Sequence, residues 1–294
     1  MNAEQYEFFR KNGYLVITGL LKKEVVASVL EMYERDRREY PQMWVPYGSQ
    51  TVNCDSLLTS PDFDSIIRHP GVLREVEDLM GGSPCLGEIC IRHMAPYTGE
   101  SPKRGWHRDK PHWVEHPLRM DFIQLMLYLT DVHEGTHCFS ISPESADEKL
   151  LDRDAQLERG GIVDFHGPIG TLILFNVSNF HTATVRETHQ ERKSVQIYYG
   201  HRHRPYLSNC TVVPESLWRD HPDPEARAFY NKLNRKTNRY LAARAEENLQ
   251  DADSIFEWCL DYDQNVKRSD NAARPEGDED APAARGQEHG TEGE

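Results

Sequence analysis

The sequence predicts a mainly β fold, a barrel or sandwich of short strands with helices before and after it along the chain. Two observations support this prediction. Between residues 87 and 203 the chain is a series of short β-type runs separated by Gly, Pro and Asp, which is typical of barrels and sandwiches. On both sides of this stretch, apolar residues recur at the spacing of a helix face. With 294 residues, the chain can bury the core of one large domain.

The N-terminal part is predicted to form a helix, a strand and a second helix. Residues 3–12 have a short amphipathic pattern, and Gly13 follows as a C-cap that ends the helix. The run Tyr14–Ile17 consists of β-forming residues. From Lys22 to Glu39 the apolar residues fall on one helix face, and Pro41 lies just beyond it.

The middle and C-terminal parts complete a single domain. Beyond Pro214 the pattern becomes helical again, and we find no internal repeat. We therefore expect one domain over residues 1–268, with a helical part (about 1–80), a β-core (about 87–204) and C-terminal helices (about 214–262). The expected strands of the core are Glu88–Met94, Phe122–Leu129, Cys138–Ser142, Thr171–Phe175, Thr182–Val185 and Ser194–Tyr199.

The last residues differ in composition from the rest. Residues 270–294 contain eight acidic and two basic residues, no aromatic residue, and many Gly, Pro and Ala. Such a segment buries too little apolar area to offset its chain entropy. We therefore expect an acidic disordered tail over residues 269–294, either a solubilising extension or a segment that recruits a partner.

The charge and the cysteines limit the class of protein. The formal net charge is −14, so we expect neither nucleic acid nor an anionic membrane as a partner. No apolar run approaches the roughly 20 residues of a membrane span, and the first residues are charged where a secretory signal needs an apolar core. The six cysteines are scattered without a CxxC pair. These features predict a cytoplasmic protein with reduced thiols, and they leave its oligomeric state open.

Two segments carry side chains that could bind a metal. His107 and Asp109 are two residues apart, so in an extended segment both leave the same face. His181 follows the strongly apolar run 171–175, and the end of such a strand can face the mouth of a barrel. Each piece alone is more often structural. Together, two imidazoles and one carboxylate form the facial triad that holds Fe(II) and leaves three positions open.

A third segment offers a site for a carboxylate. Arg192 comes eleven residues after His181, where a strand returning from a hairpin would place it near the metal but beyond bonding distance. An arginine there can bind a carboxylate through two parallel hydrogen bonds, and Ser194 faces the same side. The pattern therefore predicts a dicarboxylate cosubstrate at two of the iron positions and dioxygen at the third.

Taken together, these residues resemble the phytanoyl-CoA dioxygenase family of Fe(II)/2-oxoglutarate-dependent oxygenases. The resemblance covers roughly residues 6–204 and fades in the C-terminal helices. The run Pro143–Ala146 departs from the family pattern, so the turn there should differ and we assign it no function. The matching motifs are His107-Arg108-Asp109, His181, Arg192 with Ser194, Tyr128–Val132 with Gly135, Cys138–Pro143 and Phe8–Val16.

The resemblance implies a fold and a set of cofactors. It implies a double-stranded β-helix (jelly-roll or cupin-like) core with flanking N- and C-terminal helices, and Fe(II) bound by His107, Asp109 and His181. It also implies 2-oxoglutarate bound by Arg192 and Ser194.

The resemblance also implies a reaction. 2-Oxoglutarate and O2 would become succinate and CO2 while a small organic substrate is oxidised. Because Asp109 is present, hydroxylation or a related oxidation such as desaturation is favoured over halogenation. Gln124 lies on a strand where relatives often place a polar cosubstrate contact, and a buried amide bonded to the backbone is the alternative reading. The substrate itself stays open.

Two other functions compete with this one. The run His133-Glu134-Gly135-Thr136-His137 matches the H-E-x-x-H signature of zinc hydrolases. That motif works only on a helix, where positions i and i+4 share a face, and Gly135 disfavours a helix. We therefore expect a loop between strands. The third candidate is a barrel that binds a partner without catalysis, and the intact triad argues against it.

Overall fold

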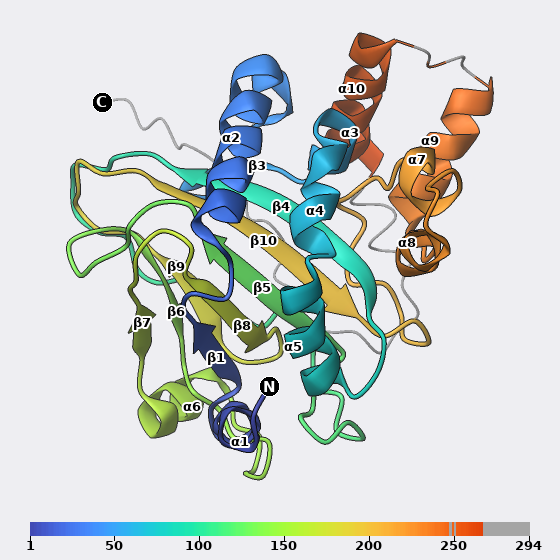
Figure 1. The fold of residues 1–294 in the computed structure, drawn as a ribbon. Helices are drawn as coiled ribbons and strands as arrows, with labels where there is room; N and C mark the ends of the chain where they lie inside the picture. Colours follow the sequence, from blue (N-terminus) through green and yellow to red (C-terminus); the bar gives the residue numbers. More distant parts are fainter. Residues whose placement is uncertain (247–248, 250, 267–294) are drawn as a thin grey trace.

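Two antiparallel sheets form the centre of the fold, and a computed structural model describes residues 1–246, 249 and 251–266 of the chain (Figure 1). The tail predicted over residues 269–294 lies outside the described residues. The strands are β1 (Tyr14–Ile17), β2 (Val45–Tyr47), β3 (Gln50–Asn53), β4 (Cys85–Met94), β5 (Phe122–Tyr128), β6 (Cys138–Ile141), β7 (Val163–Phe165), β8 (Leu172–Asn176), β9 (His181–Thr184) and β10 (Arg192–Gly200). The larger sheet has the order β1-β8-β5-β10-β4-β3-β2, and the smaller one has the order β7-β6-β9.

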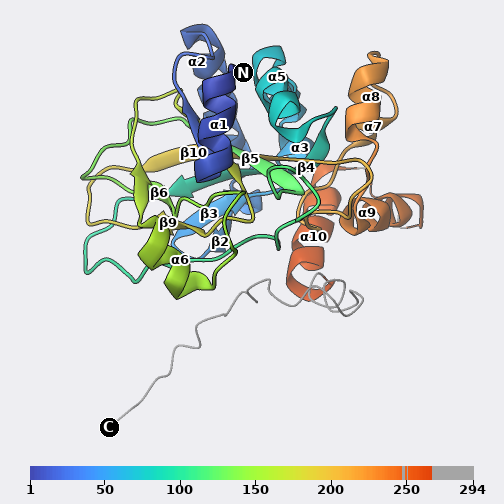
Figure 2. The ribbon, with the colours of Figure 1, turned by 90° about the horizontal axis from the view of Figure 1, so that it is seen from below.

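The helices lie outside this pair of sheets. Helices α2 to α5 cover one face of the larger sheet, and α7 to α10 gather at one end of it (Figures 1 and 2). The helices are α1 (Ala3–Asn12), α2 (Lys23–Glu39), α3 (Ser56–Thr59), α4 (Asp64–Ile67), α5 (Pro70–Met80), α6 (Arg153–Gly160), α7 (Glu215–Trp218), α8 (Pro224–Tyr230), α9 (Arg235–Glu246) and α10 (Ala252–Asp261), with short helical turns at Pro41–Met43, Pro61–Phe63 and Tyr262–Val266. Within the described residues, no helix combines the length and the apolar character that crossing a membrane requires.

Alternation along the strands divides the core into two layers. On β10, Val195 and Ile197 pack with the helices, while Tyr198 packs with the residues of the smaller sheet. Because successive side chains of a strand point to opposite faces, Arg192, Ser194 and Tyr198 share the face that looks toward the smaller sheet. We call this surface the inner face, and it carries the candidate site.

Most predicted elements are present, and the sheets contain three further strands. The chain forms α1 and β1 as expected, and Gly13 caps α1 with φ 73°. The strands β2, β3 and β7 were not predicted, because they are only three or four residues long and are defined by pairing with neighbouring strands rather than by their own composition. Strand β9 begins at His181 itself, one residue before the expected start.

Candidate metal and cosubstrate site

The structure brings His107, Asp109 and His181 together. The backbones of His107 and His181 pair in antiparallel fashion, with N–H···O distances of 3.2 and 3.0 Å, and Asp109 N donates to Val177 O at 3.0 Å. The segment around His107 thus runs as an extra short strand beside the residues that lead into β9. The nitrogen and oxygen atoms available for a metal in the three side chains all lie within 4.8 Å of one another.

Backbone contacts orient both imidazoles for metal binding. His107 Nδ1 donates to Gly105 O, and His181 Nδ1 donates to Asn179 O, each at 2.9 Å. A histidine that donates from Nδ1 presents a lone pair at Nε2, which is the usual arrangement of histidine metal ligands. The two rings lie 4.4 Å apart between centroids. Both Nε2 atoms therefore face one small volume.

Asp109 lies in that volume between the imidazoles. Its Oδ1 is 3.4 Å from His107 Nε2, and its Oδ2 is 3.5 Å from His181 Nε2. Burial alone would raise the pKa of Asp109, but the electrostatic interaction with His181 and the hydrogen bonds with both imidazoles outweigh it and hold the pKa well below its usual range. The site thus provides a carboxylate, the charged form that a divalent cation binds.

Arg108 anchors the segment from its other side. Its side chain leaves the chain between those of His107 and Asp109, and its Nη1 donates to the buried Glu144 at 2.7 Å. The guanidinium also lies over the Phe180 ring, 3.8 Å from the centroid. The run around Glu144, to which the sequence assigned no function, therefore helps to hold the segment of His107 and Asp109, the candidate metal ligands, in place.

Tyr198 is a member of the site that the sequence analysis missed. Its hydroxyl donates to Asp109 Oδ2 at 3.1 Å from strand β10. Only the register of β10 against a segment about ninety residues away creates this contact, so no local pattern indicates it. The contact fixes one carboxylate oxygen and leaves the other for a metal.

The predicted cosubstrate residues have unused hydrogen-bonding groups. Arg192, Ser194 and Gln124 are all buried on the inner face. The atoms Arg192 Nε, Arg192 Nη1, Ser194 Oγ and Gln124 Nε2 have no hydrogen-bond partner among the described residues. Burial lowers the pKa of Arg192. Since buried polar groups are nearly always satisfied, these atoms fit a site that receives a polar, anionic ligand.

Strand register places these groups at two positions along β10. Gln124 lies opposite Tyr198 and therefore near the triad, whereas Arg192 and Ser194 lie at the other end of β10. A ligand with an acidic group at each end suits this arrangement, because one end can reach the metal and the other the guanidinium. Gln50 Oε1 from β3 accepts a weak hydrogen bond from Arg192 Nη2 at 3.5 Å.

The H-E-x-x-H segment forms a turn, as predicted, and not a helix. Thr136 N donates to His133 O at 3.0 Å. Both ring nitrogens of His137 are hydrogen-bonded: Arg186 N donates to Nδ1 at 3.1 Å, and Nε2 donates to Ala95 O at 2.9 Å. The zinc-hydrolase alternative therefore lacks both the helix and the free nitrogen that it requires.

The comparisons with known proteins agree with this geometry. Residues 9–194 match the family model described as phytanoyl-CoA dioxygenase. The fold is similar to that of the non-heme alpha-ketoglutarate-dependent epimerase SnoN from nogalamycin biosynthesis, with 18% identity, TM-score 0.56, and coverage of 67% of this chain and 79% of that chain. No curated protein sequence matches the chain.

Two further solved structures share the fold. EctD from S. alaskensis, determined with 2-oxoglutarate and 5-hydroxyectoine, shows 16% identity and TM-score 0.55, and the match covers 68% of this chain and 76% of that chain. HygX from Streptomyces hygroscopicus, determined with nickel and 2-oxoglutarate, shows 18% identity and TM-score 0.56 over 68% of this chain and 87% of that chain. These likenesses confirm the predicted jelly-roll core with flanking helices.

The family model covers more than half of the chain and includes all three triad residues, Arg192 and Ser194. The resemblance noted in the sequence is thereby confirmed. The chain belongs to the phytanoyl-CoA dioxygenase family and is an enzyme of the Fe(II)/2-oxoglutarate-dependent oxygenases.

Proposed function

We propose that this enzyme binds Fe(II) through His107, Asp109 and His181 and oxidises a C–H bond of a small organic molecule. The observation that carries the proposal is the convergence of two Nε2 atoms and one carboxylate within 4.8 Å, with both Nδ1 atoms tied to the backbone. This donor set suits Fe(II) and leaves positions open for a cosubstrate and dioxygen.

We propose that Arg192 and Ser194 bind the distal carboxylate of 2-oxoglutarate and that Gln124 contacts its metal-binding end. Two observations support this assignment. These side chains carry polar atoms without a hydrogen-bond partner among the described residues, and they lie at two positions along β10 on the inner face. A bidentate pair between guanidinium and carboxylate fixes both the position and the direction of the cosubstrate.

The chemistry divides between the bound groups and the chain. When bound, iron, 2-oxoglutarate and dioxygen supply the oxidation of a C–H bond, with release of succinate and CO2. The chain holds the groups in place: the Nδ1–H groups of both imidazoles donate to backbone carbonyl oxygens, and the Tyr198 hydroxyl donates to an oxygen of Asp109. Because Asp109 occupies the ligand position, hydroxylation or a related oxidation is favoured over halogenation.

The inner face also indicates a chemical class of substrate. Arg92 of β4 lies opposite Ser194, and its Nε atom is buried without a hydrogen-bond partner among the described residues. Its guanidinium lies 5.3 Å from the centroid of the Tyr47 ring. A second cation near the centre favours a substrate that carries an anionic group.

Turnover of 2-oxoglutarate tests the proposed function. The full chain, loaded with Fe(II), is given 2-oxoglutarate, O2 and a panel of small molecules, in which each carboxylic acid is paired with its amide. We expect succinate release that depends on Fe(II) and rises with some of the acids more than with their amides. If neither iron nor any panel member affects succinate release, the binding-module alternative is favoured instead.

A Tyr198→Phe variant is expected to bind Fe(II) about 10- to 100-fold more weakly, because partners of metal ligands contribute on this scale. Anaerobic metal titration measures it. The matched control is Tyr199→Phe on the opposite face of β10, whose hydroxyl donates to Ile67 O at 2.8 Å. That control should lose about 0.5–1.5 kcal/mol of stability with unchanged metal affinity. Equal metal affinity in both variants would remove the proposed role of Tyr198.

Variants of the H-E-x-x-H segment separate the two metal hypotheses. His133→Ala and His137→Ala should keep full Fe(II) binding, measured by titration. Because both nitrogens of buried His137 are hydrogen-bonded, His137→Ala should also lower the free energy of unfolding by about 1–3 kcal/mol. Loss of bound metal from either folded variant would revive the hydrolase hypothesis.

We also propose that residues 1–268 act as one domain and that the enzyme is cytoplasmic. Contacts of the C-terminal helices with the rest of the chain support the first point: the buried Lys236 of α9 pairs with Asp55 at 2.5 Å. The six unbridged cysteines support the second.

A further inference from the structure

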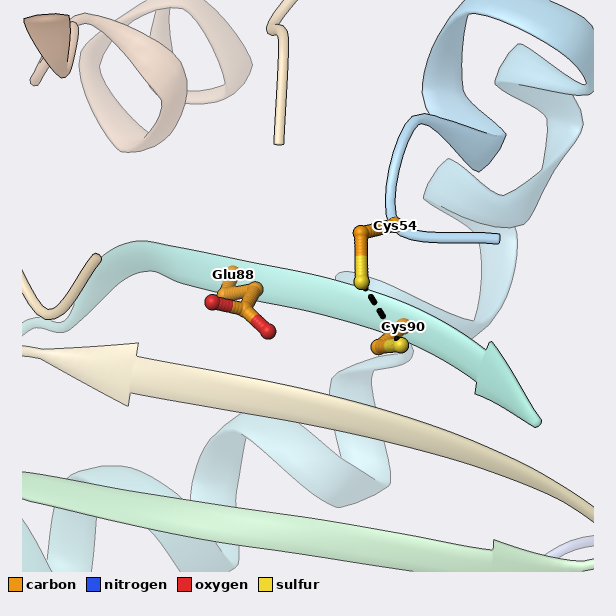
Figure 3. Close-up of side chains that lie close together, drawn as sticks. All are labelled: Cys54, Glu88 and Cys90. Carbon is orange, nitrogen blue, oxygen red and sulfur yellow. Dashed lines mark hydrogen bonds between the residues drawn. The ribbon is translucent and has the colours of Figure 1, made fainter. Parts of the chain in front are cut away.

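A second cluster of reactive side chains lies on the inner face beside the candidate metal site and shares no residue with it, because Glu88 and Cys90 lie opposite Tyr198 and Gln196 of β10. It consists of Cys54, directly after β3, and of Glu88 and Cys90 on β4 (Figure 3). The two sulfur atoms are 2.8 Å apart and share a hydrogen bond. Cys54 is half-buried and Cys90 is buried, so Cys54 is the more accessible residue of the two.

Strand pairing places the two cysteines opposite each other. In the register of β3 against β4, Val52 pairs with Arg92 and Asn53 with Ile91. Continuing by one residue pairs Cys54 with Cys90. Directly opposite residues of antiparallel strands have Cα atoms roughly 4.5–5.5 Å apart, which lies within the range of disulfides. A bond between these sulfurs therefore requires no rearrangement of the backbone.

A bound metal explains the cluster less well. Two thiolates on one zinc ion, each at about 2.3 Å in tetrahedral geometry, lie about 3.7 Å apart, whereas these sulfurs are closer. The hydrogen bond with Cys90, together with burial and the Glu88 carboxylate, raises the pKa of Cys54. Because metal binding and attack on peroxide both need a thiolate, alkaline pH favours both reactions, and this shift does not separate them. The carboxylate of Glu88 already accepts a hydrogen bond from Ser208 Oγ, so it is engaged elsewhere.

We infer that Cys54 and Cys90 form a reversible disulfide when the enzyme meets hydrogen peroxide. The Cys54 sulfur attacks one peroxide oxygen, which breaks the O–O bond and leaves a sulfenic acid and one water. The Cys90 sulfur then displaces the hydroxyl group as a second water and closes the S–S bond. Two thiols lose two protons and two electrons in total, and the peroxide takes them up and is reduced to two waters. In a reducing compartment such a bridge is transient.

The bridge would tie the hairpin of β2 and β3 to β4. This hairpin is at the edge of the larger sheet, and among the described strands β4 is its one pairing partner. It carries Gln50, which contacts Arg192, and Tyr47, which lies beside Arg92. A covalent link at Cys54 therefore restrains the segment that borders the cosubstrate residues.

Peptide mapping of the full chain tests the inference. The protein, with a chelator present so that no iron reacts with peroxide, is treated with hydrogen peroxide, alkylated and digested. We expect one linked peptide pair containing Cys54 and Cys90, lighter by two hydrogens than the free peptides and restored by dithiothreitol. Cys54→Ser should abolish it, and Cys85→Ser, at the start of the same strand, should leave it unchanged.

Other outcomes overturn the inference. It fails if Cys54 is recovered as an unreacted thiol, as a sulfinic acid, or linked to Cys210. It also fails if native mass spectrometry before oxidation finds one zinc per chain that Cys54→Ser releases. A second readout uses amide hydrogen exchange over residues 45–53: exchange should slow on oxidation of the native chain and stay unchanged in Cys54→Ser. The mapping depends on no bound iron, so its result is independent of the proposed function.

Discussion

The Asp109→Ala variant is expected to lose Fe(II) binding and oxidation together. Removing the carboxylate leaves two neutral imidazoles facing the cation, and breaking a buried charge pair from one side costs about 3–5 kcal/mol, or two to nearly four powers of ten in affinity. Anaerobic titration with Fe(II) measures the first effect, and succinate release measures the second. The fold should persist, because the backbone N–H of residue 109 still donates to Val177 O.

Two further variants serve as controls for this prediction. Asp154→Ala, on the exposed surface of α6, should bind Fe(II) like the native chain. His181→Ala should also lose Fe(II) binding, since it removes another proposed ligand of the same iron. If Asp109→Ala keeps native Fe(II) affinity while folded, the proposed ligand set is wrong.

The second large effect is expected at Arg192. Arg192→Ala should raise the Kd for 2-oxoglutarate by roughly 10- to 150-fold, the worth of a charge-assisted hydrogen bond of about 1.5–3 kcal/mol. Fe(II) affinity should stay native, because Arg192 does not contact the triad in the structure. Anaerobic titration of the iron-loaded variant with 2-oxoglutarate measures the change.

A companion variant distinguishes binding from structure. Arg192 is fully buried without an ion pair among the described residues, and burial lowers its pKa. Arg192→Met should therefore raise the melting temperature of the ligand-free chain, by about 2–4 °C per kcal/mol gained, while it weakens 2-oxoglutarate binding. A lower melting temperature with native 2-oxoglutarate affinity would make Arg192 a structural residue.

The neighbour on the same strand provides the matched control. Lys193 points to the opposite face of β10, where it pairs with Glu34 at 2.5 Å and with Glu191 at 2.6 Å. Lys193→Ala removes one positive charge from the adjacent position without touching the inner face. Its affinity for 2-oxoglutarate should remain native, and an equal loss in both variants would indicate a general charge effect instead of a specific contact.

Features that depend on neighbouring residues in the chain, such as helix ends and the facing of side chains along a strand, could be predicted from the sequence. Gly13 ends α1 because a left-handed residue is needed there, and its carbonyl then accepts from the backbone N–H of Asn176, the last residue of β8. The two-residue spacing of His107 and Asp109 placed both side chains on one face. The arginine after His181 was predicted to lie near the site, beyond bonding distance of a metal, because strands return through hairpins; that it is buried was not predicted.

Features that depend on long-range register could not be predicted. Tyr198 contacts Asp109 only because β10 lies beside the segment around His107, and Cys54 faces Cys90 only because β3 pairs with β4. The strands β2 and β3 contain Pro46 and follow no apolar alternation, so their pairing partners define them. Which molecule is oxidised depends on the shape of the inner face, and the sequence does not specify it.

The central claim is that one iron is held by His107, Asp109 and His181 with 2-oxoglutarate reaching from it to Arg192. A crystal structure of the chain, grown without oxygen in the presence of Fe(II) and 2-oxoglutarate, tests this directly. The account predicts iron within bonding distance of both Nε2 atoms and one Asp109 oxygen, with the distal carboxylate on Arg192. Iron at other side chains, or a distal carboxylate away from Arg192, would contradict it.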